Sequence, residues 1–149
     1  MAVNAPNYSP IPAEDDLAEW NERMNATIGQ SVPLRIEYVS KQRVVVSMTV
    51  TPRTHQPFGI MHGGVSLLLA ESAASIGANC TAPAGMMAVG QEINANHLRA
   101  KIDGELTATA VPVHVGRATQ VWSVEIRGED GKLVCISRCT LANVPAGSA

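Results

Sequence analysis

Aromatic residues and charge are both scarce in this sequence of 149 residues. Aromatic side chains make up 3% of it, and 11 Lys and Arg against 13 Asp and Glu leave a net charge of −2. This composition offers neither a stacking platform nor a basic surface, so we expect no nucleic-acid partner. With 46% hydrophobic and 16% charged residues, the chain should fold, and a partner should cover part of its surface.

Long apolar segments and recognisable cysteine patterns are also absent. The longest apolar run, residues 63–78, contains Glu71 and is shorter than the roughly 20 residues that cross a bilayer. Residues 1–12 lack the features of a signal peptide, so we expect a cytoplasmic protein without a membrane partner. The three cysteines and four histidines match no metal-ligand or redox spacing, and no Gly-rich nucleotide fingerprint is present. We therefore expect no metal and no cofactor.

The pattern of apolar residues predicts two helices and six strands. Apolar positions three to four residues apart, acids in the first turn and a final glycine indicate a helix over residues 13–29. Residues 64–79 should form a second helix, which is apolar on nearly every side and is therefore buried. Alternating residues and turn signals such as Asp103-Gly104 and Asp130-Gly131 predict strands over residues 32–39, 43–50, 87–98, 105–113, 119–127 and 133–142.

This order of elements indicates an α+β domain in which a single antiparallel sheet curls around one central helix. The first two strands should form a hairpin, and the last four should form an antiparallel meander. We expect an N-terminal segment with a capping helix over residues 1–31, the main domain over residues 32–144 and a tail over residues 145–149.

Glu71 is the one ionisable residue of the second helix. Burying a carboxylate among apolar side chains is costly unless the group is paired or used in chemistry. Its helical face is otherwise apolar, and Ser75, four residues on, is the nearest polar neighbour. Two interpretations stay open, namely a structural ion pair with a distant base such as Arg99 and a catalytic carboxylate.

A histidine and two glycines, His62-Gly63-Gly64, stand at the start of the same helix. The first N–H groups of a helix have no intrahelical acceptor, and glycine lets a substrate approach them. Such donors suit the developing oxyanion of a thioester carbonyl, although the same glycines also serve tight packing. Gln56 could reach this place through its amide, and His62 could position the loop or orient Gln56. An ordinary structural hydrogen bond is the commoner role of a single histidine.

The spacing of Gly63 and Glu71 prevents them from acting on one substrate within one chain. They lie eight residues apart, which corresponds to about 12 Å along a helix. If both touch the same thioester, they belong to different copies of the chain. The sequence then predicts a homodimer whose central helices lie antiparallel across a twofold axis.

Two later segments combine basic side chains with turn residues. His97, Arg99 and Lys101 alternate at a predicted strand end, and HVGR, residues 114–117, connects two later strands. Both segments could hold phosphates through charge-assisted hydrogen bonds and backbone N–H groups, as a carrier such as coenzyme A would require. A solvated strand edge and an ordinary loop are the alternatives.

Three motifs resemble one enzyme family. The segment QPFGIMHGGVSLLLAES, residues 56–72, is similar to the hotdog-fold acyl-CoA thioesterases, and more narrowly to the PaaI-like group of 4-hydroxybenzoyl-CoA and 1,4-dihydroxy-2-naphthoyl-CoA thioesterases. The similarity continues in VGQEINANHLR, residues 89–99, and in QVWSVEI, residues 120–126, and it covers roughly residues 32–144.

The resemblance implies a hotdog fold, a homodimer that often forms a homotetramer, and hydrolysis of an acyl-CoA with an aromatic acyl group. It implies that Glu71 is the catalytic carboxylate, as nucleophile or general base, and that the N–H of Gly63 polarises the carbonyl. Gln56 and His62 would assist at the carbonyl and the loop, and Ser75 would help to place water or the carboxylate. The implied substrate-binding residues are Gly90, His97, Leu98, Arg99, Ala100, His114, Val115, Gly116, Arg117, Ala118 and Thr119.

Two other functions share this fold and stay open here: a dehydratase or hydratase of acyl thioesters, and a non-catalytic acyl-CoA-binding protein. Hydrolysis releases a free thiol, hydration changes the enoyl absorbance, and a binding protein turns nothing over. The identity of the acyl group depends on which side chains of Met61, Leu68, Met86 and Met87 face the cleft.

Overall fold

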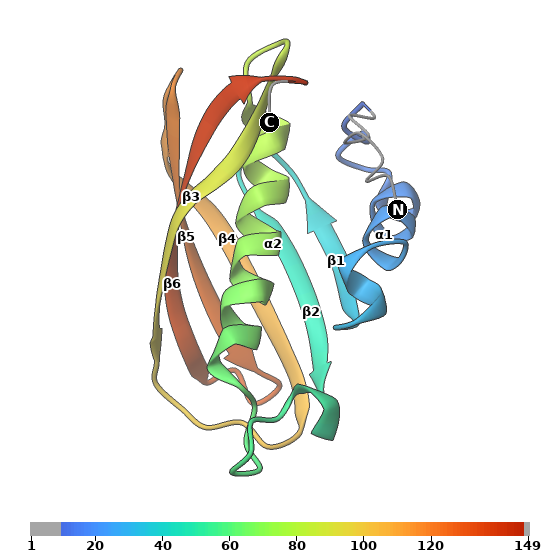
Figure 1. Ribbon diagram of the computed structural model, residues 1–149, viewed down its shortest axis with the longest axis vertical. Coiled ribbons are helices and arrows are strands. Elements are labelled where there is room, and N and C mark those ends of the chain that lie inside the picture. The colour runs from blue at the N-terminus through green and yellow to red at the C-terminus, as the bar shows by residue number, and fades with distance from the viewer. Residues whose placement is uncertain (1–9, 148–149) are drawn as a thin grey trace, which may run out of the picture.

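A long helix lies along one face of a curled sheet in the computed structural model (Figure 1). The structure describes residues 10–147, so the first nine residues of the expected N-terminal segment and the last two of the expected tail lie outside the described residues. The helix α2 (Gly63–Thr81) is 19 residues long, and its buried positions are Ser66, Leu69, Ala70, Ala73, Ala74, Ile76, Gly77 and Ala78. Most of these side chains are small, so the sheet approaches the helix closely. No helix within residues 10–147 is long and apolar enough to cross a membrane.

The sheet has six antiparallel strands in the order β1-β2-β4-β5-β6-β3. Buried and exposed residues alternate along most strands, because one face of the sheet covers α2. The predicted antiparallel sheet around a central helix is therefore confirmed. The strand bounds are β1 (Leu34–Val39), β2 (Val44–Val50), β3 (Met86–His97), β4 (Gly104–Val115), β5 (Thr119–Gly128) and β6 (Leu133–Pro145).

The predicted four-strand meander is wrong in one strand. β4, β5 and β6 do follow one another, but β3 pairs with β6 and not with β4. The place beside β4 is taken by β2, whose Val44, Val46, Met48 and Val50 are buried in the core. Residues 98–103 carry the chain from β3 across the start of α2 to β4 (Figure 1). As a result β3 is an edge strand, with β6 as its one partner among the described strands.

The N-terminal helix is shorter than its apolar pattern predicts. α1 (Leu17–Asn25) begins after Asp16, whose side chain accepts a hydrogen bond from the N–H of Glu19 at 3.0 Å, and a separate 3-10 helix covers Ile28–Gln30. α1 packs against β1 beside the sheet (Figure 1), and its Trp20 is buried. The two predicted turns at residues 103–104 and 130–131 are occupied by glycines with φ of 79° and 74°, which favours glycine there.

Candidate active site

A cleft of about 310 Å³ opens at the N-terminal end of α2. Two loops form its walls, one before α2 and one after β3, and they are tied together because the N–H of Met61 donates to the carbonyl of Lys101 at 2.8 Å. A second tie joins His55 Nε2 to the carbonyl oxygen of Ile102 at 2.6 Å. The residues that line the cleft are Gln56, Ile60, Met61, Gly63, Ser66, His97, Leu98, Arg99, Ala100 and Lys101. Six of the predicted site residues therefore meet here.

Gly63 supplies an unpaired N–H donor to this cleft. The imidazole of His62 caps the helix, with Nδ1 accepting from the N–H of Gly64 at 2.9 Å, and the carbonyl of His62 accepts from Val65 at 2.9 Å. In residues 10–147 the N–H of Gly63 itself has no acceptor. A donor at a helix N-terminus, aimed into a cleft, is suited to a carbonyl oxygen that gains negative charge.

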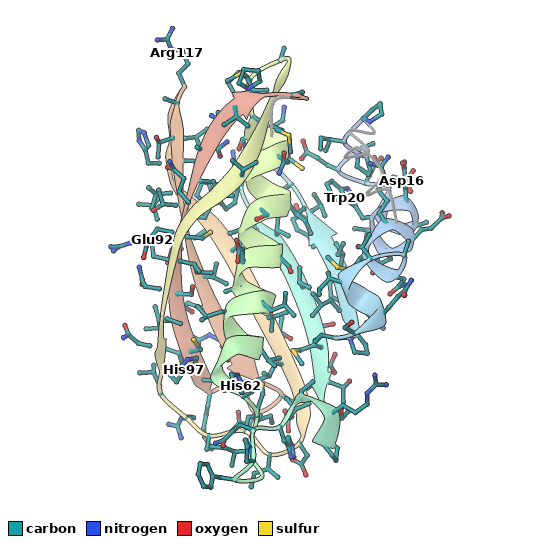
Figure 2. The ribbon with its side chains drawn as sticks, in the orientation of Figure 1. Asp16, Trp20, His62, Glu92, His97 and Arg117 are labelled. Carbon is teal, nitrogen blue, oxygen red and sulfur yellow. The ribbon has the colours of Figure 1, made fainter. Side chains whose placement is uncertain are left out.

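His97 stands directly against Gly63. Its Nε2 is 2.9 Å from the position that a Cβ at Gly63 would take, so a larger residue at position 63 would displace the ring. Figure 2 shows His62 and His97 together at this end of α2. His97 is the last residue of β3, so the end of this edge strand contributes a side chain to the lining of the cleft.

Gln56 presents an amide donor to the same cleft. Its Oε1 accepts from the N–H of Phe58 at 3.1 Å, and its backbone N–H donates to the carbonyl of Ile60 at 2.8 Å. Because the oxygen of the amide is bonded inside the loop, the Nε2 group is left as a donor. This geometry suits a second hydrogen bond to a substrate carbonyl.

Glu71 lies two turns further along α2, outside the lining of its own chain's cleft. The side chain is half-buried, and it makes no hydrogen bond or ion pair with any residue that the structure describes, Arg99 included. Its Oε1 is 2.5 Å from the position of a Cβ at Gly90, on the exposed edge strand β3. Burial raises the pKa of the neighbouring Cys139 thiol to about 11, and the charge of Glu71 adds to that rise. Ser75, one turn beyond, is also half-buried.

The remaining predicted residues, His114 to Thr119, lie at the opposite end of the molecule. They cover the end of β4, the turn at residues 116–118 and the first residue of β5, and Figure 2 shows Arg117 far from His62 and His97. A second hollow, of about 380 Å³, touches this turn at Arg117 and Ala118. Within one chain the predicted substrate-binding residues other than Gly90 are thus divided between the two ends of α2.

Two groups of polar residues were not predicted from the sequence. Ser66 is fully buried on the cleft side of α2, and its hydroxyl has no hydrogen-bond partner in the described chain. Ser66 follows Gly63 by three residues and therefore lies on the same helical face. This spacing could have indicated Ser66 as a cleft residue. Asn143 and Gln120 form a buried network under the 114–119 turn, for which no local pattern exists. Residues 10–147 contain no group of three His, Cys, Asp or Glu side chains arranged to hold a metal.

The chain matches a known family model over residues 58–135, and this model describes the thioesterase superfamily. It is 50% identical over 113 residues to a 1,4-dihydroxy-2-naphthoyl-CoA hydrolase from Listeria monocytogenes, with 76% of this chain and 92% of that protein covered. It is 41% identical over 125 residues to the proofreading thioesterase EntH from Cronobacter turicensis, with 81% of this chain and 91% of that protein covered.

A crystal structure of a mutant thioesterase from Pseudomonas aeruginosa is similar to this structure. The TM-score is 0.84 at 40% identity, and 92% of this chain and 99% of that chain are covered. The match takes in most of both chains, so the predicted hotdog fold is confirmed. The chain therefore belongs to the thioesterase superfamily, and it is a thioester hydrolase.

Proposed function

We propose that this enzyme hydrolyses the thioester of an aromatic acyl-CoA, of the hydroxybenzoyl or dihydroxynaphthoyl kind, to the free acid and CoA. The name of the Listeria relative supports this acyl class. The observation that carries the proposal is Glu71, a half-buried carboxylate on an apolar helix, without a partner in residues 10–147 and beside the edge of β3. Such a carboxylate is available to attack a thioester or to take a proton from water.

The edge of β3 supports a site shared between two copies. β3 carries both contacts of interest, because Gly90 faces Glu71 and His97 faces Gly63. If two copies pair antiparallel along β3 about the midpoint between Gly90 and His97, each copy's Glu71 comes next to the other copy's His97. The carboxylate of one chain then reaches the Gly63 cleft of its partner. An unpaired edge of 12 residues also favours such pairing.

The same register brings the two predicted binding regions to one ligand. With Glu71 of one copy opposite Gly63 of the other, the helix that carries Glu71 continues for ten residues to Thr81. That distance is about 15 Å along a helix axis. The 114–119 turn of the copy that carries Glu71 lies near the end of this helix, and therefore beyond the thioester at a reach that an extended pantetheine arm can cover. We therefore propose that this turn receives the phosphates of coenzyme A.

In the proposed mechanism the carbonyl oxygen of the thioester binds the N–H of Gly63, at the positive end of the α2 dipole. Gln56 adds a donor through its amide, and His62 holds the helix start in place. Glu71 of the other copy either attacks the carbonyl carbon, which forms an anhydride that water then opens, or it removes a proton from an attacking water that Ser75 helps to place. Both routes expel CoA as the thiolate. Single-turnover hydrolysis in ¹⁸O-water separates them, because label in the Glu71 carboxylate requires the covalent route.

A panel of CoA esters tests the proposed activity through release of free thiol. We expect the highest kcat/KM for 4-hydroxybenzoyl-CoA or 1,4-dihydroxy-2-naphthoyl-CoA, with phenylacetyl-CoA and hexanoyl-CoA as poorer substrates. Glu71→Gln should lower kcat by about 10²-fold or more while the dimer stays intact. Near-normal turnover by that variant would refute the role of Glu71, and a preference for hexanoyl-CoA would refute the aromatic class.

A mixed dimer tests the shared site. Gly63→Ala crowds His97 in one chain, and Glu71→Gln removes the carboxylate from the other. Each homodimer should be nearly inactive, but a heterodimer purified through two tags retains one intact site and should show about half of the wild-type activity. An inactive heterodimer would mean that Gly63 and Glu71 of the same chain act together.

A further inference from the structure

Asn143, on β6, holds the turn between β4 and β5 from the inside. Its Nδ2 donates to the carbonyl oxygen of Gly116 at 3.0 Å and to that of Arg117 at 3.1 Å. Its backbone N–H donates to the carbonyl of Ala118 at 2.9 Å. Asn143 is only 8% exposed, so three successive carbonyl groups of a surface turn point inward to one buried residue.

A second buried amide fixes Asn143. Gln120 donates through Nε2 to Asn143 Oδ1 at 2.9 Å and to the carbonyl of Ala78 in α2 at 2.9 Å. Its Oε1 accepts from Thr81 Oγ1 at 2.7 Å and from Trp122 Nε1 at 3.1 Å. Because each polar atom of the Gln120 amide is bonded, this network holds one geometry and ties the end of α2 to the turn.

The inward carbonyls determine where the amide hydrogens of the turn point. In a planar trans peptide the C=O of one residue and the N–H of the next point in opposite directions, and the described chain contains no cis peptide. The N–H groups of Arg117 and Ala118 therefore face away from Asn143. Neither has an acceptor within residues 10–147. The side chain of Arg117 extends outward from the same turn (Figure 2). Adjacent free N–H groups beside a guanidinium form a site for an anion such as phosphate.

We propose that Asn143 is a positioning residue for coenzyme A, which keeps the 114–119 turn in the one shape that offers these donors to the phosphates. The proposal rests on the proposed function, in which this turn receives the nucleotide end of the substrate. Asn143 does not touch the ligand, since its polar atoms are bonded to the turn and to Gln120. Losing it should weaken binding of the part of the substrate that carries phosphate and leave the thioester chemistry unchanged.

The test compares two substrates that share one acyl group. Asn143→Leu keeps the side-chain size but removes the donors of the amide. We expect its KM for the aroyl-CoA to rise about tenfold, with kcat within about twofold of wild type. Its KM for the corresponding N-acetylcysteamine thioester, which lacks phosphates, should not change.

Asn21→Leu is the matched control. Asn21 also uses its amide for three hydrogen bonds, to Leu17 and to Ile36 on β1, at 2.8 to 2.9 Å, and it lies far from the turn. Asn21→Leu should lower the melting temperature to a similar extent without changing either KM. Equal changes of KM for both substrates in Asn143→Leu, or a parallel loss of kcat, would assign Asn143 a purely structural role and overturn the proposal. An unchanged KM for the CoA ester would also overturn it.

A measurement on the wild-type protein covers the case in which Asn143→Leu does not fold. Free CoA should slow amide hydrogen exchange at Arg117 and Ala118, whereas pantetheine without phosphate should not. Unchanged exchange at these two residues in saturating CoA would overturn the proposal. This readout needs no turnover, so an enzyme that binds CoA at the turn but hydrolyses no aroyl ester would refute the proposed function and leave the role of Asn143 intact.

Discussion

Two glycines leave the space that two ionisable side chains, Glu71 and His97, occupy between α2 and β3. A Cβ at Gly90 would lie 2.5 Å from Oε1 of Glu71, and a Cβ at Gly63 would lie 2.9 Å from Nε2 of His97. Both neighbouring atoms are at the ends of side chains that can rotate away. Substitution at these glycines should therefore move the functional groups more than it disturbs the fold.

Gly90→Ala should act on catalysis and spare stability. The new methyl group displaces the Glu71 carboxylate, and a displacement of about 1 Å can lower a rate by about 10²-fold. We expect a fall in kcat of about 10- to 100-fold with a melting temperature close to that of the wild type. Steady-state kinetics and a thermal melt on the same sample check this. Full activity would place the reacting carboxylate elsewhere.

Ser66→Ala should not destabilise the protein. The hydroxyl of Ser66 is buried without a partner in the described chain, and alanine has the higher helix propensity, so we expect a gain of up to about 1 kcal/mol in the free energy of unfolding. Ser137→Ala is the comparison, because Ser137 is also buried but donates to the carbonyl of Asn94 at 2.7 Å. That substitution should cost about 1–3 kcal/mol. Equal losses in urea unfolding would show that Ser66 has a partner.

At the scale of elements, Gly77 sets how closely α2 approaches the sheet. A Cβ at this position would lie 2.4 Å from Cη2 of Trp122, whose indole ring is fully buried. A rigid ring cannot rotate away, so the helix would have to move from the sheet. The close approach explains a glycine in the middle of a helix, where it otherwise lowers stability.

Gly77→Ala should lower the free energy of unfolding by about 1–3 kcal/mol, because overpacking outweighs the gain in helix propensity. Urea unfolding measures this loss. Adding Trp122→Leu should relieve the clash, so the double variant should be less destabilised than the sum of the two single changes. Additive losses would mean that the helix tolerates the methyl group by another route.

The elements that could be predicted from the sequence are those with local signals. α2, the β1–β2 hairpin and the turns at residues 103–104 and 130–131 follow from periodicity and glycines that lie close together in the chain. The partner of β3 could not be predicted in this way, since its first pair joins Met86 to Pro145. Pairing over such a separation depends on which strand covers which flank of α2, and no local pattern encodes that choice.

For the candidate site, too, the spacing of residues within one element could be predicted from the sequence, but the contacts between elements could not. Gly63 and Glu71 belong to one helix, so their spacing could be derived directly from the sequence. The meeting of Gly63 with His97, and of Glu71 with Gly90, depends on the position of β3 at the sheet edge. Asn143 was missed because its partners at Gly116 and Arg117 are more than 20 residues away in sequence.

For the molecule as a whole, buried thiols should make stability fall at alkaline pH. Burial raises the pKa of Cys80 and of Cys139 to about 11, from an ordinary value of 9.0. Between these values the unfolded chain has released protons that the folded chain still binds, so the free energy of unfolding decreases as pH rises from about 9 to about 11. Urea unfolding at pH 8 and pH 10.5 checks this. A Cys80→Ala/Cys139→Ala variant should show a weaker dependence, and an equal slope would assign it to other groups.

Assembly through β3 gives a prediction for the whole molecule. Asn94 lies beside the midpoint between Gly90 and His97, so the two copies of residue 94 approach each other across the proposed twofold axis. Asn94→Asp adds two like charges there, next to Glu92, and should weaken the dimer about tenfold or more, with loss of activity on dilution. Thr49→Asp is the control, because it adds the same charge at an exposed position of β2, away from the axis. It should change neither the dimer affinity nor the activity on dilution. Sedimentation at several protein concentrations measures the association. A dimer that withstands Asn94→Asp at low salt would show that the copies meet on another surface, and the carboxylate of Glu71 would then need a different route to the cleft.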